Sequence, residues 1–166
     1  MKPGTSMLTI RPATAADVSL ILAFIRELAA YEREPDAVAA TEADLLRDGF
    51  GPRPEFRVLL AEWDAQPAGF ALFFHNYSTW QGRPGLYLED LFVRPQFRGK
   101  GIGKALLVRL AQIARQENCG RLAWEVLDWN TPSIEFYKSL GAETLREWLI
   151  MRVQGEALDR LARLET

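Results

Sequence analysis

Apolar residues recur every three to four positions in two long stretches of the chain. The first stretch lies between about residues 15 and 33, and the second runs from residue 102 to Gly120. Such spacing places the apolar side chains on one face of an α-helix. These residues are Val18, Ile21, Leu22, Ile25, Leu28 and Ala29 in the first stretch, and Ile102, Leu106, Leu110 and Ile113 in the second. We therefore predict two long amphipathic helices.

Six other segments carry the short apolar or alternating runs that are typical of β-strands. They lie at residues 7–11, 56–63, 68–77, 86–93, 121–128 and 144–153, and shorter helices are predicted at 41–49, 131–141 and 155–164. The strands between residues 56 and 93 follow one another directly, which predicts an antiparallel meander. The pattern is that of an α+β protein with a mixed, mostly antiparallel sheet of about six to seven strands flanked by helices.

Two predicted helices begin with the same local signature. Thr14 is followed three residues later by Asp17, and Thr41 is followed by Asp44. In a capping box the hydroxyl accepts a hydrogen bond from the third helical N–H, and the acidic side chain bonds back to the first residue. We expect capping boxes at both positions.

The composition is that of one globular domain, which we expect to span residues 1–166. Hydrophobic residues make up 48% of the chain and charged residues 25%, which are ordinary values. The formal net charge of −2 argues against nucleic-acid binding, which a basic face usually supports. Apolar runs fall short of the roughly 20 residues that a membrane span needs, and the first residues lack the apolar core of a signal peptide. We expect a cytoplasmic protein that binds neither membrane nor nucleic acid.

Metal and disulfide chemistry have few residues to draw on. Cys119 is the one cysteine and His75 the one histidine, which leaves too few ligands for a Cys/His zinc site and excludes an intramolecular disulfide. The same counts weigh against a Ser-His hydrolase. We expect no bound metal, and we interpret Cys119 as a structural residue.

A glycine-rich turn precedes the helix that starts at residue 102. Gly99, Gly101 and Gly103 lack a Cβ atom, so a ligand can approach their backbone closely. The helix N-terminus adds unpaired N–H groups and a positive dipole end. Three cations flank the turn, namely Arg98, Lys100 and Lys104. The segment is therefore a candidate cradle for a pyrophosphate.

The glycine turn has two alternative interpretations, a purely structural turn and a dinucleotide site. An ordinary tight turn would need the same glycines. A Rossmann dinucleotide site could use Asp128 as its ribose-binding acid, but its glycines follow the strand directly, whereas about five residues intervene here, and two alternating βαβ halves are missing. A Walker A loop is excluded because the chain has no Gly-Lys-Ser/Thr sequence.

Three motifs in series resemble the GNAT acetyltransferases. In chain order they are Leu91-Phe-Val-x-Pro-x-Phe-Arg-Gly, Arg98-x-x-Gly101-x-Gly103 and Asn130-x-x-Ser-Ile-x-Phe-Tyr137-x-x-x-Gly141. The second resembles the acetyl-CoA motif of that family, (Q/R)-x-x-G-x-(G/A). Three motifs in the correct order indicate the family far more strongly than one would.

Further segments resemble the diamine acetyltransferases, which include spermidine/spermine acetyltransferase and thialysine N-ε-acetyltransferase. They are IRPATAAD (10–17), ELAAYE (27–32), LLRDGFG (45–51), YSTWQG (77–82), YLEDLFV (87–93) and VLDWN (126–130). The resemblance covers nearly the whole chain, and YSTWQG and VLDWN are more similar to the thialysine branch. Ser78 lacks the acidic side chain that the polyamine enzyme has near this position.

The resemblance implies a GNAT fold with acetyl-CoA bound where two parallel strands splay apart. The strand at 86–93 would pair its backbone with the pantetheine arm, and an N–H there would also reach the thioester carbonyl. The residues implied in cofactor binding are Leu91, Phe92, Val93, Arg98, Gly99, Lys100, Gly101, Ile102, Gly103, Lys104, Asn130, Ser133 and Tyr137. Asn130 and Ser133 are equally suited to cap the helix that follows them.

Two residues have implied catalytic roles. The resemblance places Tyr137 as the general acid that protonates the leaving thiolate, and Glu89 as the base that takes a proton from the amine, directly or through water. A base is needed because an amine of pKa about 10.4 is mostly protonated at neutral pH. Glu89 and Asp90 point to opposite faces of a regular strand, and a β-bulge would let both contribute.

Acidic and aromatic residues suit a cationic acceptor, through charge and cation–π contacts. The candidates for substrate binding are Tyr31, Glu32, Trp80, Glu89, Glu125 and Asp128. The alternatives are that Glu125 simply alternates outward on its strand and that Asp128 caps a helix.

The expected function is transfer of acetyl from acetyl-CoA to a primary amine of a small molecule, by direct attack in a ternary complex. The alternatives are a protein lysine or N-terminal acetyltransferase, and a non-catalytic sensor that binds acyl-CoA. The resemblance also implies a homodimer. The apolar segment EWLIMRV (147–153) would contribute either to its interface or to the core.

Overall fold

The computed structural model describes residues 7–164, which form two compact units divided between Leu127 and Asp128. The sequence prediction of a single domain over residues 1–166 stays a prediction.

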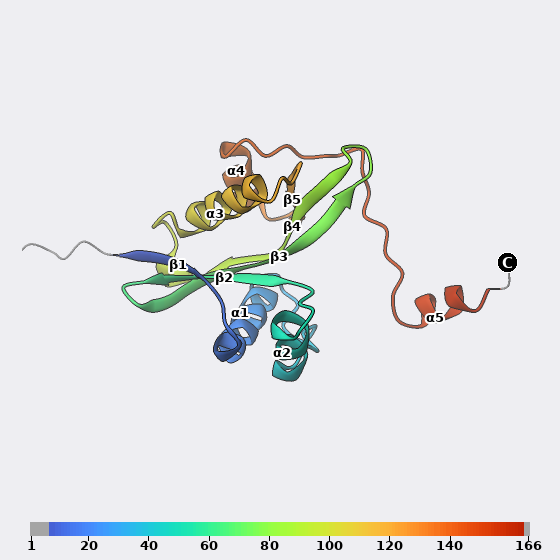
Figure 1. The fold of residues 1–166 in the computed structure, drawn as a ribbon, viewed down its shortest axis with the longest axis horizontal. Coiled ribbons are helices and arrows are strands. Elements are labelled where there is room, and N and C mark those ends of the chain that lie inside the picture. Colours follow the sequence, from blue (N-terminus) through green and yellow to red (C-terminus); the bar gives the residue numbers. More distant parts are fainter. Residues whose placement is uncertain (1–6, 165–166) are drawn as a thin grey trace, which may run out of the picture. The chain divides into compact units, whose positions relative to one another are not determined.

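The first unit is built on a five-stranded sheet with the order β1-β2-β3-β4-β5 (Figure 1). Its strands are β1 (Leu8–Pro12), β2 (Arg57–Trp63), β3 (Gln66–Ser78), β4 (Arg83–Val93) and β5 (Leu122–Trp124). The first four strands pair antiparallel, and β5 pairs parallel to β4. The expected mixed α+β sheet is confirmed, with five strands in place of six to seven.

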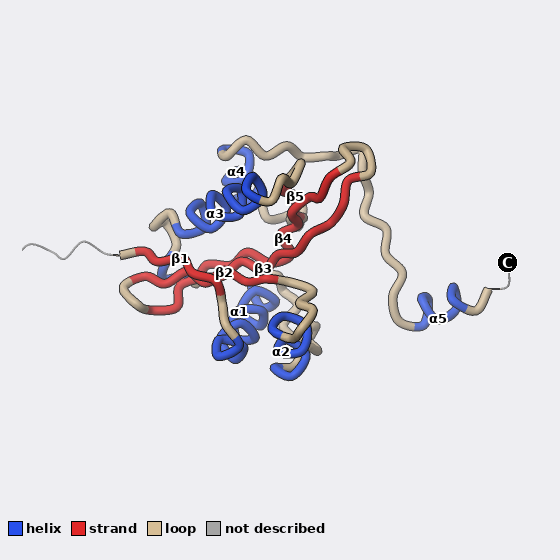
Figure 2. Tube along the Cα trace, viewed as in Figure 1, coloured by secondary structure: helices blue, strands red, loops and turns tan. Residues whose placement is uncertain are grey.

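Helices cover both faces of this sheet. Figure 2 shows α1 (Val18–Tyr31) and α2 (Glu42–Phe50) on one face and α3 (Ile102–Gln116) on the other. The two expected capping boxes are present, one before a 3₁₀ turn that leads into α1 and one before α2. Thr41 and Asp44 exchange hydrogen bonds of 3.2 and 3.0 Å, so the local signature sets where α2 begins.

The core between the sheet and α1 is aromatic. The rings of Phe24 on α1 and Phe70 on β3 stack at 5.3 Å between centroids, and Phe92 on β4 meets Phe24 edge-on at 6.4 Å. All three side chains are buried, and each contributes about 1.5–3 kcal/mol of burial free energy. Arg94 follows β4, packs over the Phe24 ring and pairs with Glu27 at 2.7 Å. These contacts fix α1 against the end of β4.

The second unit contains α4 (Thr131–Ser139) and α5 (Glu156–Ala162). Both helices were expected, but the strand predicted at 144–153 is wrong, because these residues form no strand. Their large apolar side chains are exposed, namely those of Leu145, Trp148, Leu149, Ile150, Met151 and Val153. A strand is stable only when its backbone groups pair with a neighbouring strand, and no described residue supplies one here.

Within residues 7–164, no helix is long and apolar enough to cross a membrane.

Candidate active site

The glycine turn has the backbone conformation that glycine favours. Gly99 and Gly101 have φ values of 73° and 78°, in the left-handed region, and Gly101 is the N-cap of α3. No described atom lies within 4 Å of a Cβ built on either residue, so the backbone angle and not packing demands glycine there. The open space over the turn and the N–H groups of the first turn of α3 suit a phosphate.

Two of the three cations at the turn pack on aromatic rings. The Arg98 guanidinium lies 4.8 Å from the ring centroid of Tyr31, the last residue of α1, and its Nε donates a hydrogen bond of 2.9 Å to the carbonyl of Val93. Lys100 lies 5.0 Å from the ring centroid of Trp63 on β2. Arg98 therefore joins the glycine turn to the end of α1.

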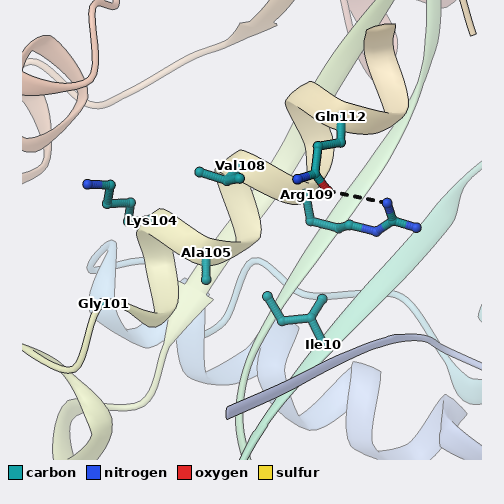
Figure 3. Close-up of a pocket in the computed structure, with 7 residues that line it drawn as sticks. All are labelled: Ile10, Gly101, Lys104, Ala105, Val108, Arg109 and Gln112. Atoms are coloured by element: carbon teal, nitrogen blue, oxygen red, sulfur yellow. Dashed lines mark hydrogen bonds between the residues drawn. The ribbon is translucent and has the colours of Figure 1, made fainter. Parts of the chain in front are cut away.

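An open pocket of about 400 Å³ lies beside the turn, between α3 and β1 (Figure 3). It is lined by Ile10, Gly101, Lys104, Ala105, Val108, Arg109 and Gln112. Arg109 donates a hydrogen bond of 3.4 Å to Gln112, and Figure 3 shows both side chains on the α3 wall. Lys104 and Arg109 make this wall cationic.

The second half of β4 has an open edge. β5 pairs with β4 only at residues 86–88, opposite residues 122–124. Among the described residues, no strand pairs with residues 89–93 of β4 on this side. Backbone N–H and C=O groups at such an edge can bind an extended ligand. Leu91, Phe92 and Val93 lie in this open segment, although the Phe92 side chain is buried in the core.

A β-bulge on β4 brings two carboxylates to one face of the sheet. Asp90 lies opposite Leu72 of β3, whereas Leu88 lies opposite the next residue, Phe73, so Glu89 is the additional residue. Leu72 and Phe73 lie on opposite faces of β3, and cross-strand partners share a face, so Asp90 lies on the face opposite to Leu88. Glu89 directly follows Leu88 and lies on that same opposite face. The bulge expected as an alternative is confirmed, and the rule for a regular strand does not apply here.

This face is the one that α1 covers. Leu72 belongs to the buried cluster that packs against α1, and cross-strand partners share a face. Asp90 is half-buried, whereas Glu89 is exposed. Burial, followed by the charges of Glu89 and Glu32, raises the pKa of Asp90 from 3.8 to about 7, and desolvation raises the pKa of Glu32, the residue after α1. The sequence pointed to Asp90 only as a second contributor in the case of a bulge, through its position beside Glu89.

The other expected substrate residues are spread over the first unit. Glu125 follows β5 and accepts a hydrogen bond of 2.8 Å from the hydroxyl of Tyr87. Trp80 is 89% exposed in the turn between β3 and β4. Trp80 precedes the first residue of β4, Arg83, and the strand rises about 20 Å from Arg83 to Glu89, at roughly 3.3 Å per residue. The end of α1 and the bulge therefore gather Tyr31 and Glu32 with Glu89, but not Trp80.

The second unit carries the remaining expected residues. Asn130 is buried and is the N-cap of α4, since its side chain accepts a hydrogen bond of 3.4 Å from the backbone of Ser133. This confirms the capping alternative for Asn130, and Asp128 is not the cap. Tyr137 is half-buried on α4, beside the ring of Phe136 at 5.3 Å. Cofactor contacts of Asn130 and Ser133 and the acid role of Tyr137 stay predictions.

One group of possible metal ligands exists within residues 7–164, formed by His75, Glu117 and Cys119. Glu117 accepts hydrogen bonds of 2.7 and 2.8 Å from Arg57 and pairs with His75 at 2.8 Å. Burial raises the pKa of the Cys119 thiol, which keeps it protonated. The guanidinium occupies both oxygens of Glu117, so the group fits an ion-pair network that ties the end of α3 to β2 and β3.

Comparison with known proteins defines the class to which this fold and site belong. Residues 21–142 match the acetyltransferase (GNAT) family, and the chain belongs to this family. It is 42% identical over 164 residues to thialysine N-epsilon-acetyltransferase of Bos taurus, covering 92% of this chain and 96% of the bovine protein.

Two further comparisons extend this result. The chain is 43% identical over 159 residues to human spermidine/spermine N(1)-acetyltransferase-like protein 1, covering 90% of this chain and 23% of that protein. Among solved structures, it is similar to the integron cassette protein VCH_CASS6 from the mobile metagenome of V. cholerae. The TM-score is 0.79 at 33% identity, over 95% of this chain and 98% of that one. The expected family and fold are therefore confirmed, and the chain is an acetyltransferase of the GNAT family.

Proposed function

We propose that this acetyltransferase moves an acetyl group from acetyl-CoA to a primary amine of a small cationic molecule, of the thialysine or diamine type. The open edge of β4 carries this proposal, because it holds the carboxylates of Glu89 and Asp90 at one end and leads toward the glycine turn at the other. The glycine turn suits the phosphates of a long ligand, and the carboxylates suit a cation.

Acetyl-CoA would bind along the open edge. Its pyrophosphate would lie over Gly99 and Gly101, where the N–H groups of the first turn of α3 and the charge of Lys104 favour an anion. Its pantetheine arm would extend along residues 91–93 and exchange backbone hydrogen bonds with them. A backbone N–H of this edge would then donate to the thioester carbonyl and stabilise the oxyanion of the tetrahedral intermediate.

The amine would bind on the face of the sheet that α1 covers. Glu32, Glu89 and Asp90 supply negative charge there, and Tyr31 supplies an aromatic ring. Ser78 is buried in the β3–β4 hairpin, where its hydroxyl accepts a hydrogen bond of 3.3 Å from Gln81, so this position adds no charge for a distant second ammonium. The charge distribution supports a short acceptor over a long polyamine.

The reaction joins the two bound substrates directly. The neutral amine attacks the thioester carbonyl carbon, a C–N bond forms, and the C–S bond breaks. The sulfur leaves as a thiolate and takes a proton from Tyr137, the proposed acid. Tyr137 then regains the proton that the new amide nitrogen gives up. This mechanism needs no acyl-enzyme, and the buried, protonated Cys119 offers no nucleophile for one.

The test is release of free CoA from acetyl-CoA over a panel of acceptors: thialysine, lysine, spermidine, putrescine, an aminoglycoside and a histone-tail peptide. We expect the highest kcat/KM for thialysine or another short amine. Turnover with the peptide alone would instead assign a protein acceptor. Binding of acetyl-CoA without turnover on any acceptor would assign the sensor function.

We also propose that two copies associate through the segment 145–153. Its six large apolar side chains are exposed, and large apolar side chains exposed together in one segment are typical of an interface. The paired change Leu149→Asp and Met151→Asp should convert a dimer into a monomer by light scattering after size exclusion. Leu46→Asp, at an exposed leucine of α2, is the matched control. A wild-type chain that is monomeric at all concentrations would refute this interface.

A further inference from the structure

We infer that Asp90, and not Glu89, is the group that takes the proton from the acceptor ammonium. This inference rests on the proposed function, since it concerns the base of that reaction. Both carboxylates lie on one face, so which of them acts depends on their surroundings.

The bulge decides where Asp90 points. Asp90 lies opposite Leu72 on β3, and two residues further along β4 Phe92 lies opposite Phe70. Leu72, Phe70 and Phe92 all belong to the buried cluster under α1. Asp90 therefore continues the apolar row of this face toward the end of α1, at the point where the open edge of β4 begins.

Glu89 differs from Asp90 in exposure. As the additional residue of the bulge, Glu89 is exposed, and its carboxylate remains hydrated. Asp90 is half-buried, with Glu32 close enough to interact electrostatically from the end of α1. A carboxylate that is partly withdrawn from water accepts a proton more readily than a hydrated one.

The charged groups that face Asp90 come from several elements. Glu89 acts from β4 itself and Glu32 from the end of α1, while the β3 partner, Leu72, is apolar. Arg98 faces the same region, with its guanidinium on the rings of Tyr31 and Phe92 and its Nε bonded to the backbone. Burial and the two carboxylates together raise the pKa of Asp90 to about 7.

This value suits proton transfer from an amine. For an ammonium of pKa about 10.4, raising the base from 3.8 to about 7 improves the transfer equilibrium by about 10³-fold. At neutral pH a large fraction of such a group is still ionised and able to accept a proton.

The ammonium gives one proton to the Asp90 carboxylate, and the freed lone pair forms the C–N bond with the thioester carbonyl carbon. The C–S bond breaks, the thiolate takes a proton from Tyr137, the proposed acid, and Tyr137 regains the second proton of the nitrogen. Asp90 then releases its proton to solvent, so one proton leaves for each acetyl group transferred.

The test compares pH profiles of kcat/KM for the wild type, Asp90→Asn, Glu89→Gln and Glu32→Gln, with the best acceptor of the panel. The wild type should lose activity below about pH 7. Asp90→Asn should lower kcat/KM at pH 8 by about 10²–10³-fold and remove this acidic limb. Glu89→Gln and Glu32→Gln should keep the limb but move it to lower pH, by about 1 pH unit or less, because each removes a charge that raises the pKa of Asp90.

The opposite pattern would overturn the inference. If Glu89→Gln removes the limb while Asp90→Asn only moves it, Glu89 is the base. Asp90→Glu, which should keep a limb, and far-UV circular dichroism of each variant separate loss of the base from loss of folding. Failure of the proposed function would look different, since the wild type itself would then turn over no amine.

Discussion

Ionised Asp90 should lower the free energy of unfolding of the free protein above neutral pH, and the variant Asp90→Asn should show the size of this effect. The pKa of Asp90 rises from 3.8 to about 7 in the folded state. Each pKa unit corresponds to about 1.36 kcal/mol, so the penalty reaches about 4 kcal/mol when the group is ionised in both states. Because the pKa is higher in the folded state, protonation of Asp90 stabilises the folded protein. This stabilisation is fully present below about pH 3.8 and is lost as the pH rises through about 7.

Urea unfolding of the wild type and Asp90→Asn at pH 4.5 and pH 8 measures this penalty. Linkage predicts that the unfolding free energy of Asp90→Asn, relative to that of the wild type, is higher at pH 8 than at pH 4.5 by up to about 3 kcal/mol. Asp36→Asn, at an exposed position, is the matched control for the chemical change. If the difference in unfolding free energy between Asp90→Asn and the wild type changes by less than about 0.5 kcal/mol from pH 4.5 to pH 8, an ionised, buried Asp90 is refuted.

Three further predictions concern the remaining site residues. Tyr137→Phe should lower kcat by about 10²-fold or more while acetyl-CoA binding by calorimetry is kept, and Tyr77→Phe, at an exposed tyrosine, is its control; near-normal turnover would remove Tyr137 from the acid role. Arg98→Ala should raise KM for the amine as well as for acetyl-CoA, because its guanidinium packs on Tyr31; a change confined to acetyl-CoA would make Arg98 a phosphate ligand only. Gly101→Ala should cost about 1–2 kcal/mol of stability in thermal unfolding because its φ is 78°, and a neutral change would mean that the turn relaxes.

Local rules predicted most of the first unit from the sequence. The faces of α1 and α3, the capping boxes at Thr14 and Thr41, and the β2–β3–β4 meander each depend on residues close together in the chain. The glycine turn was predicted for the same reason, because a left-handed backbone selects glycine locally.

Features that depend on distant pairing were harder to predict. The segment 144–153 has the composition of a strand, but composition does not supply the neighbouring strand that a ladder requires. β5 is only three residues long for a related reason, since its length depends on where β4 moves away from it. The bulge at Glu89 depends on the register between β3 and β4, so the sequence left two orientations open and could not single out Asp90.

A sequence optimised for stability alone would keep like charges apart and hydrated, and the acidic face at the bulge does neither. Glu32, Glu89 and Asp90 share one region, and their mutual repulsion together with burial makes ionisation of Asp90 unfavourable in the free protein. A cationic acceptor reverses this balance, because its charge favours the ionised carboxylates that repel each other in its absence. Binding of the acceptor should therefore lower the pKa of Asp90 and stabilise the folded state more at pH 8 than at pH 6. The same charges that weaken the free fold would thus favour a cation over a neutral amine, which is why such conflicts concentrate at functional sites.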